Sequence, residues 1–296
     1  MNELVRLTAR DAVELLRKGE VTPVEMVDAA AERIAEVEPA VNALPTLAVE
    51  RAREHAQRLM KDGTPSDVPR GYLYGLPVAI KDLKDVAGVR STKGSRIYAN
   101  HIPERSDYLV TNIEAKGGMI IAKSNTPEFG AGANTFNEVF GKTRNPWDTS
   151  KTCGGSSGGS AVALATGEVW LATGSDLGGS LRIPASFCSI VGMRPSPGRV
   201  PHGPKDMPFA SLSVEGPMAR TVGDLALFLD TQAGQEALDP LSIPAPDTSF
   251  VDAVDSPVAP KRVAYTPDLG IAPVDPEVRA ICEAAVKKFA DFGAAV

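Results

Sequence analysis

Histidine and cysteine are scarce in this chain, which has three of each among 296 residues. The cysteines, Cys153, Cys188 and Cys282, have neither the paired spacing of a metal site nor the pattern of a disulfide framework. Their odd number is typical of a reducing compartment, so we expect a cytoplasmic protein. We expect Cys153 to be a small packed residue rather than a nucleophile.

Positive charge is also in short supply. The chain has 31 lysines and arginines against 37 aspartates and glutamates, a formal net charge of −6, with no local basic cluster. Nucleic acids and anionic membranes are therefore disfavoured partners. The N-terminal stretch is charged throughout, so we expect neither a secretory signal nor a membrane span. The 43% hydrophobic and 23% charged fractions are those of an ordinary soluble enzyme.

The order of the patterns indicates the fold. The first 60 residues carry helix caps and helical spacing, and from Gly75 onward short apolar strands alternate with helices. This alternation predicts an α/β fold, with a mixed β-sheet covered by helices on both faces. The expected helices are residues 8–19, 22–38, 46–62, 107–116 and 221–230, and the expected strands are residues 77–80 and 119–123.

The last part of the sequence changes character. Residues 235–260 are rich in proline and aspartate, which favours a linker or a surface excursion. Residues 261–265 have the pattern of a strand, and Asp275-Pro276-Glu277 opens a final helix closed by Gly293. The sequence stops where a further strand would begin. We therefore expect a single domain, residues 1–296, that is incomplete at its C-terminus.

One stretch, Cys153–Ala185, is rich in glycine and serine without being a simple repeat. Each glycine and serine cluster leads directly into apolar residues, so the glycines are expected where the backbone turns sharply or approaches a ligand. Ser156 and Ser180 lie among glycines whose N–H groups could point at one small anion. Upstream, Lys81 ends the apolar run Leu76-Pro77-Val78-Ala79-Ile80, which predicts a lysine on a buried strand.

A serine nucleophile needs a base, and the usual base is histidine. None of His55, His101 and His202 lies beside either serine in the sequence. Residues 154–158 formally match the G-x-S-x-G elbow of other serine hydrolases, but no β-branched apolar strand precedes them. A buried lysine is an alternative base, because burial disfavours the ammonium form. A simpler interpretation pairs Lys81 with Asp82, although alternation on a strand points their side chains to opposite faces.

Three segments carry a resemblance to a known family. GLPVAIKD from Gly75, GGSSGGSA from Gly154 and GSDLGGSLRIPA from Gly174 resemble, in this order, the amidase signature family. The resemblance covers about residues 71–230, which we call the signature core, with residues 1–65 as an N-terminal helical part. It implies that Ser180 is the acylated nucleophile, that Ser156 is a bridging serine on a cis peptide bond, and that Lys81 is the base.

The resemblance also implies the surroundings of the triad. The backbone N–H groups of Leu177, Gly178, Gly179 and Ser180 would form the oxyanion hole. Phe129, Gly130 and Ser156 would contact the substrate. From the residues alone, Arg182 could hold a substrate carboxylate or brace the loop by pairing with Asp176, and we favour the brace. Ser157 could contact the triad or satisfy only its own loop.

The expected function is hydrolysis of a small-molecule carboxamide to a carboxylate and ammonia or an amine, with no metal or organic cofactor. An alternative within the family is the glutamine-hydrolysing subunit of a tRNA-dependent amidotransferase, the one case in which a nucleic-acid partner is expected. Residues 198–218 look more like those of stand-alone amidases. An alternative of another class is a non-enzymatic module that binds an anion through backbone N–H groups. The sequence identifies neither the amide nor the oligomeric state, for which a homodimer is one option. Family members are longer, so the resemblance also implies a truncated chain with an open pocket and impaired activity.

Overall fold

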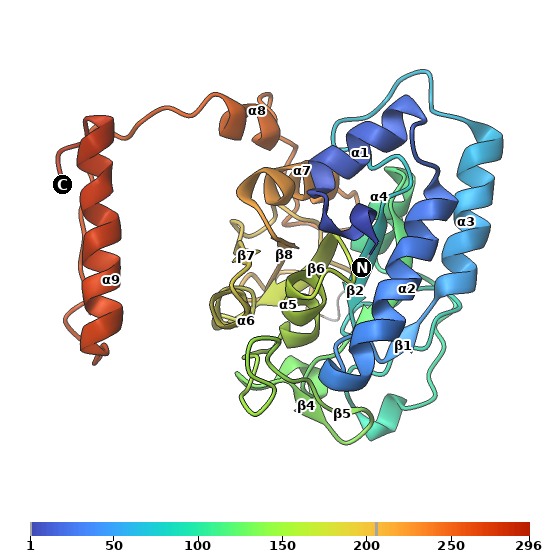
Figure 1. The fold of residues 1–296 in the computed structure, drawn as a ribbon, viewed down its shortest axis with the longest axis horizontal. Helices are drawn as coiled ribbons and strands as arrows, with labels where there is room; N and C mark the ends of the chain where they lie inside the picture. The colour runs from blue at the N-terminus through green and yellow to red at the C-terminus, as the bar shows by residue number, and fades with distance from the viewer. Residues whose placement is uncertain (1, 205–206) are drawn as a thin grey trace. The chain divides into compact units, whose positions relative to one another are not determined.

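The computed structural model describes residues 2–204 and 207–296. The contacts divide the chain into two compact units, residues 1–251 and residues 252–296. Figure 1 shows the ribbon of both units. The signature segments all lie in the first unit.

The first unit is built around a six-stranded sheet of order β1-β3-β2-β6-β8-β7. Strand β2 pairs in parallel with β3 and β6, whereas β1, β8 and β7 join by antiparallel pairing, so the sheet is mixed as predicted. The strands are β1 (Thr46–Leu47), β2 (Pro77–Lys81), β3 (Met119–Ser124), β6 (Leu171–Asp176), β7 (Val191–Gly192) and β8 (Val214–Ala219), with a separate hairpin of β4 (Phe136–Asn137) and β5 (Gly141–Lys142).

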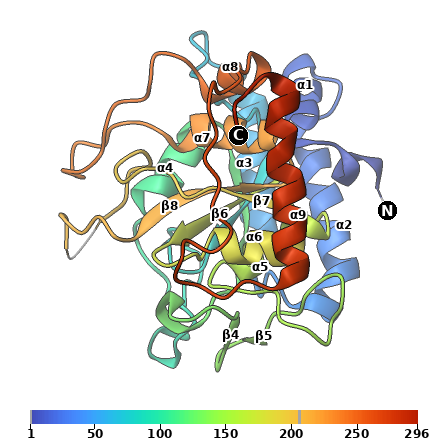
Figure 2. The same ribbon diagram turned by 90° about the vertical axis from the view of Figure 1, so that its left-hand side faces the viewer.

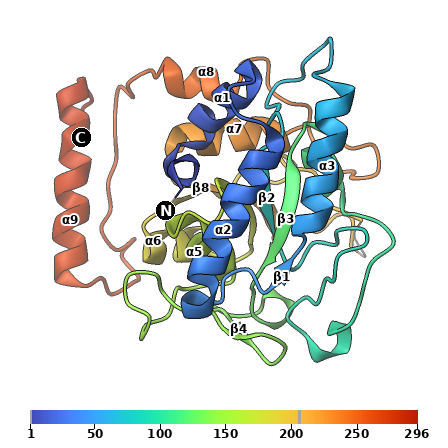
Figure 3. The same cartoon turned by 45° about the vertical axis from the view of Figure 1, so that its right-hand side comes forward.

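Helices cover this sheet. Figure 2 shows α4 and α7 on one side of the strands and α5 and α6 on the other, and Figure 3 shows α2 and α3 beside β2 and β3. The predicted mixed sheet with helices on both faces is confirmed. The helices are α1 (Ala9–Lys18), α2 (Pro23–Val41), α3 (Val49–Asp62), α4 (Tyr108–Ala115), α5 (Gly158–Ala165), α6 (Arg182–Cys188), α7 (Val222–Gln232), α8 (Phe250–Asp255) and α9 (Pro276–Lys287), with 3₁₀ turns at Glu3–Arg6, Arg96–Tyr98, Glu128–Gly130 and Lys288–Phe292.

The helix starts follow from local capping. Thr22 Oγ1 accepts a hydrogen bond from Glu25 N at 3.2 Å, and Glu25 Oε2 accepts one from Thr22 N at 2.8 Å. This reciprocal capping box starts α2 at Pro23, the residue type that loses nothing at the first helical position. Helix α3, in contrast, begins at Val49 rather than at the predicted Thr46, because residues 46–47 pair with β3 as an edge strand.

Strand β2 lies in the middle of the sheet, and its five residues are all buried. An apolar run covered on both faces is typical of a central parallel strand, and it ends at Lys81. Because β2, β3 and β6 run in the same direction, their carboxyl ends lie at one edge of the sheet. Ligand sites of open α/β sheets form at such an edge.

In the second unit, α9 begins after Asp275, whose side chain accepts a hydrogen bond from Glu277 N at 2.8 Å. A 3₁₀ turn extends it to Gly293, as predicted. The predicted strand at residues 261–265 is wrong. In the described structure this segment makes only an isolated parallel bridge between Arg262 and Ala295, so it lacks the ladder of hydrogen bonds that defines a strand.

Candidate active site

Lys81 lies at the carboxyl end of β2, fully buried, with its amine surrounded by serine hydroxyls. Lys81 Nζ donates to Ser156 Oγ at 2.7 Å, to Ser157 Oγ at 2.9 Å and to Ser175 Oγ at 3.0 Å. No carboxylate is among these partners. Burial is the main reason that the pKa of Lys81 falls from 10.5 to about 7. The amine is therefore able to exchange a proton near neutral pH.

The simpler interpretation, a pair between Lys81 and Asp82, does not hold. Asp82 points to the opposite side of the sheet, where its Oδ1 lies 2.7 Å from Lys123 Nζ and its Oδ2 accepts from Thr92 Oγ1 at 2.6 Å. The alternation of a strand separates the two side chains, as the sequence indicated. Lys123 has the charge partner that Lys81 lacks.

The glycine-rich loop before α5 brings the first serine to this amine. The peptide bond between Gly155 and Ser156 is cis, and Ser156 and Ser157 are both buried. The loop is fastened by Thr135, whose Oγ1 donates to Gly154 O at 2.9 Å and accepts from Gly158 N at 3.1 Å.

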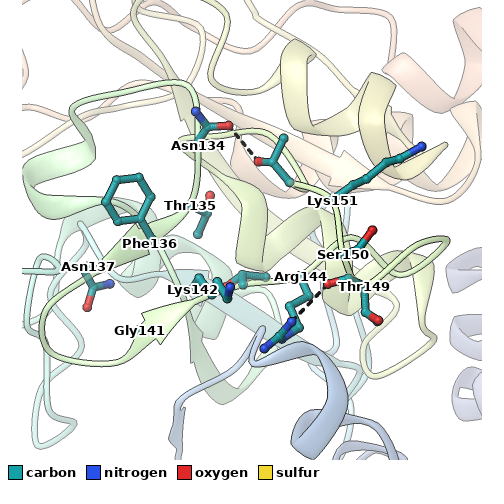
Figure 4. Close-up of a pocket in the computed structure, with 12 residues that line it drawn as sticks. Asn134, Thr135, Phe136, Asn137, Gly141, Lys142, Arg144, Thr149, Ser150 and Lys151 are labelled. Carbon is teal, nitrogen blue, oxygen red and sulfur yellow. Dashed lines mark hydrogen bonds between the residues drawn. The ribbon is translucent and has the colours of Figure 1, made fainter.

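Thr135 also lines a cavity of about 470 Å³ between the β4–β5 hairpin and residues 144–152 (Figure 4). Thr152 and Asn134 line the same cavity, and Thr152 Oγ1 donates to Asn134 Oδ1 at 2.8 Å. The cavity is therefore lined by Thr135, the residue that holds the serine loop in place.

The second serine loop follows β6 and is held by one carboxylate. Asp176 Oδ1 accepts from Gly179 N at 2.8 Å, and Asp176 Oδ2 accepts from Leu181 N at 3.2 Å and from Arg182 Nε at 3.0 Å. Burial would raise the pKa of Asp176, but the hydrogen bonds from Arg182, Gly179 and Leu181 outweigh it and hold the pKa at about 2. Arg182 thus braces this loop, which was the favoured interpretation of its role.

Ser180 lies in this loop and is half-buried. Its carbonyl oxygen accepts from Ser157 N at 3.2 Å, which ties the two serine loops together. Within residues 2–204 and 207–296, hydrogen bonds join Lys81 to Ser156 but none joins Ser156 to Ser180. Gly179 N donates to Asp176 Oδ1. In the described structure, the N–H groups of this loop that have no acceptor are therefore those of Leu177, Gly178 and Ser180.

Of the residues expected at the substrate, Gly130 lies close to Ser156. A Cβ atom on Gly130 would lie 3.6 Å from Ser156 Oγ, an ordinary contact, and 2.7 Å from Leu83 Cδ1, so Leu83 would have to move. Glycine is favoured here because its φ of 71° is in the left-handed region. Phe129 has a left-handed φ of 52° and is half exposed, with its ring edge-on to Tyr98 at a centroid distance of 6.3 Å.

Two contacts of Lys81 follow from tertiary structure. The sequence pattern is compatible with either role of Ser157, and it does not indicate a role for Ser175. Ser175 lies on β6, and the parallel pairing of β2 with β6 brings it to the amine. A Cβ on Gly174 would come within 2.9 Å of Ser157 Oγ, so the neighbouring glycine lets the loop approach the strand. The sequence pattern that could have identified Ser175 is its alternation with Thr173, which places both side chains on one face of a strand.

Neither the histidines nor Cys153 competes for the role of base or nucleophile. His55 Nδ1 lies 3.9 Å from Glu114, His101 packs against the Tyr98 ring, and His202 Nε2 lies 3.5 Å from Glu215. Burial raises the pKa of Cys153 to about 11, which keeps its thiol protonated. Among the described residues, no group of three or more histidine, cysteine, aspartate or glutamate side chains could hold a metal.

The comparisons with known proteins agree with this fold. The family model Amidase matches residues 25–296. An acylamidase of Rhodococcus erythropolis is 37% identical over 290 residues, covering 98% of this chain and 61% of the relative. A glutamyl-tRNA(Gln) amidotransferase subunit of Roseiflexus sp. (strain RS-1) is 38% identical over 296 residues, covering 100% of this chain and 60% of the relative.

Solved structures of similar fold also include an amide-hydrolysing protein of this family. A bacterial aryl acylamidase of the amidase signature family superposes with a TM-score of 0.90 at 32% identity, covering 98% of this chain and 60% of that chain. A 6-aminohexanoate cyclic dimer hydrolase in complex with its substrate has a TM-score of 0.88 at 30% identity, covering 99% and 60%. The fold is that of amidase signature proteins. This chain belongs to the amidase family, and it spans about 60% of the length of the curated relatives it matches.

No helix in the described part of the chain combines the length and the apolar character needed to cross a membrane.

Proposed function

We propose that this protein hydrolyses small-molecule carboxamides through an acyl-enzyme on Ser180. The observation that carries the proposal is the 2.7 Å hydrogen bond from the buried amine of Lys81 to Ser156 Oγ. An uncharged amine at this place accepts the proton of Ser156, which in turn takes the proton of Ser180. Ser180 Oγ then attacks the carbonyl carbon of the amide.

The remaining steps use the same groups. The carbonyl oxygen becomes an oxyanion, which the N–H groups of Leu177, Gly178 and Ser180 stabilise; one such donor contributes about 3 to 4 kcal/mol. Gly179, the fourth expected donor, supports the loop through Asp176 instead. The proton returns through Ser156 to the leaving nitrogen, and the C–N bond breaks. Water then attacks the ester carbon, giving its proton to the relay, and releases the carboxylate and Ser180.

The relay from Ser156 to Ser180 closes by rotation of a hydroxyl about its Cα–Cβ bond. Catalytic hydrogen bonds are often long without substrate and tighten when it binds. Phe129 and Gly130 would form the wall against which the acyl group lies. Gly130 supports this role because a Cβ atom at this position would lie only 3.6 Å from Ser156 Oγ.

A second candidate is glutamine hydrolysis as part of an amidotransferase. It is supported by the 38% identity to the Roseiflexus amidotransferase subunit, which is close to the value for the acylamidase. Ammonia release from glutamine, compared with release from aliphatic and aryl amides, separates the two candidates. We expect turnover of the simple amides, and activity on glutamine alone would favour the second candidate.

The nucleophile is tested by labelling with a serine-directed fluorophosphonate followed by peptide mapping. We expect the label on Ser180, and we expect Ser180→Ala to abolish labelling and turnover while the melting temperature stays close to that of the wild type. The control is Ser189→Ala, a serine at the end of α6 and outside the two serine loops, which should label normally. A label on Ser156 or Ser157, or full activity of Ser180→Ala, would contradict the proposal.

A further inference from the structure

A second buried ionic group lies beside Lys81 and has no part in the steps above. Lys84 Nζ is 3.0 Å from Glu215 Oε1, and the two side chains are 7% and 2% exposed. We call these two residues the Lys84–Glu215 pair. Burying two charges is costly even when they are paired, so their position next to a catalytic amine calls for a physical explanation.

Two short connections place the pair against Lys81. Lys84 follows Lys81 by one turn, in which Lys84 N donates to Lys81 O at 3.0 Å. Glu215 lies on β8 directly opposite Ser175 on β6. Residues directly opposite on antiparallel strands carry their side chains on the same face, about 5 Å apart. Ser175 Oγ accepts from Lys81 Nζ, so Glu215 is separated from that amine by one small side chain.

The two members of the pair act on Lys81 with opposite sign. Burial is the main cause of its lowered pKa; the Glu215 carboxylate raises that pKa, and the Lys84 ammonium lowers it. For Lys84 itself, burial lowers the pKa, but Glu215 and Asp107 outweigh this and raise it, so Lys84 keeps its proton. A charged Lys84 therefore offsets the field that Glu215 would otherwise exert on Lys81.

We propose that the Lys84–Glu215 pair sets the fraction of Lys81 present as neutral amine, with both members acting as positioning residues rather than catalytic ones. The proposal rests on the proposed role of Lys81 as base. An unpaired carboxylate here would hold Lys81 as an ammonium that cannot accept a proton, and an unpaired ammonium would make it a weaker base.

The other charges near this amine have partners of their own. Asp176 is paired with Arg182 and with Arg194, whose guanidinium lies 3.2 Å from Asp176 Oδ1. On the α4 side, Asp107 Oδ2 lies 3.4 Å from Lys84 Nζ.

Three more charged or titratable neighbours complete the surroundings. Asp82 is paired with Lys123 on the opposite face of β2. Asp85 faces Lys93 at 3.8 Å, and His202 Nε2 lies 3.5 Å from Glu215 Oε1. These residues are unchanged in the variants below, although Asp107 loses a partner in Lys84→Met and His202 loses a charged neighbour in Glu215→Gln.

The test is a direct titration of Lys81 by NMR in protein labelled with ¹³C-lysine, its signal being assigned by its loss in Lys81→Met. We expect Lys84→Met to raise the titration midpoint of Lys81 by about one pH unit, and Glu215→Gln to lower it by a similar amount. The double variant should return to within about half a unit of the wild type. The matched controls are Lys151→Met and Asp148→Asn, which break an exposed pair at 3.5 Å and should leave the midpoint unchanged.

The direction of the two shifts decides the question. Midpoints that move in the same direction, or that do not move in folded variants, would overturn the proposal, because a purely structural role predicts no opposite signs. If Lys84→Met fails to fold, Glu215→Gln alone decides, since an unchanged or raised midpoint contradicts the proposal.

The titration needs no substrate, so it is separate from the proposed function. Absence of fluorophosphonate labelling at any pH would contradict the role of Ser180, whereas an unshifted Lys81 would contradict only the role of the pair. Where both hold, the acid limb of the labelling rate should move with the NMR midpoint in each variant.

Discussion

Replacing the buried amine of Lys81 should abolish activity and yet stabilise the protein at neutral pH. In Lys81→Met a flexible apolar side chain of similar length takes the place of the lysine. The variant lacks the proposed base, so neither amide hydrolysis nor labelling of Ser180 should occur. The effect on stability follows from the cost of keeping an amine, without a carboxylate partner, in the interior.

The magnitude comes from the pKa and the hydrogen bonds. Lowering the pKa from 10.5 to about 7 corresponds to about 5 kcal/mol of unfavourable free energy at neutral pH, at about 1.4 kcal/mol per pH unit. The lost hydrogen bonds to Ser156, Ser157 and Ser175 together cost about 3 kcal/mol, at about 1 kcal/mol each. Lys81→Met should therefore be more stable than the wild type by about 2 kcal/mol at pH 7.

The sign of this difference should depend on pH. Because the pKa of Lys81 is lower in the folded state, the unfolded chain binds more protons between about pH 7 and 10.5. Wild-type stability from this group therefore rises with pH across that window, whereas methionine has no such dependence. The advantage of Lys81→Met should vanish near about pH 8.5, and at about pH 9.5 the variant should be the less stable protein.

Urea unfolding followed by tryptophan fluorescence measures this difference, because both tryptophans, Trp147 and Trp170, lie in the first unit. The matched control is Lys123→Met, which removes an equally buried lysine but leaves Asp82 unpaired. That variant should be destabilised by about 3 to 5 kcal/mol at pH 7. Burial also lowers the pKa of Lys123, so the loss should be larger, not smaller, at about pH 9.5. A stability difference between wild type and Lys81→Met that stays constant from pH 7 to about 9.5 would contradict a lowered pKa of Lys81.

Two further predictions concern the loops. Asp176→Asn should slow fluorophosphonate labelling at least tenfold, because the amide cannot replace a carboxylate that accepts from Gly179, Leu181 and Arg182. Arg182→Gln should slow labelling less, since Asp176 keeps its backbone donors. Equal effects of the two variants on the labelling rate would contradict this account. Gly159→Ala should lower the free energy of unfolding by more than about 2 kcal/mol, because its Cβ would lie 2.3 Å from Asn125 N. Gly178→Ala, whose Cβ meets no atom within 4 Å, is the stability control, and similar melting temperatures of the two variants would argue against the packing described.

Local sequence was sufficient for much of the fold. The Thr22 capping box and the Asp275 cap fix helix starts because capping groups lie within three residues of one another in the chain. At two places where an element depends on a distant partner, the prediction was wrong. Thr46 joins an edge strand because β3 offers it hydrogen bonds, and residues 261–265 form no strand because they make a single bridge.

For the candidate site, the sequence was sufficient to identify the candidate catalytic residues. It identified an apolar strand ending in Lys81 and two serines set among glycines, because composition and short-range pattern encode burial and backbone freedom. Only the tertiary structure decided the contacts of that lysine. Ser175 reaches the amine through the pairing of β6 with β2, and Glu215 approaches it through the pairing of β8 with β6. Strand register and the burial of charged groups depend on residues far apart in the chain. Both affect whether the amine of Lys81 is neutral.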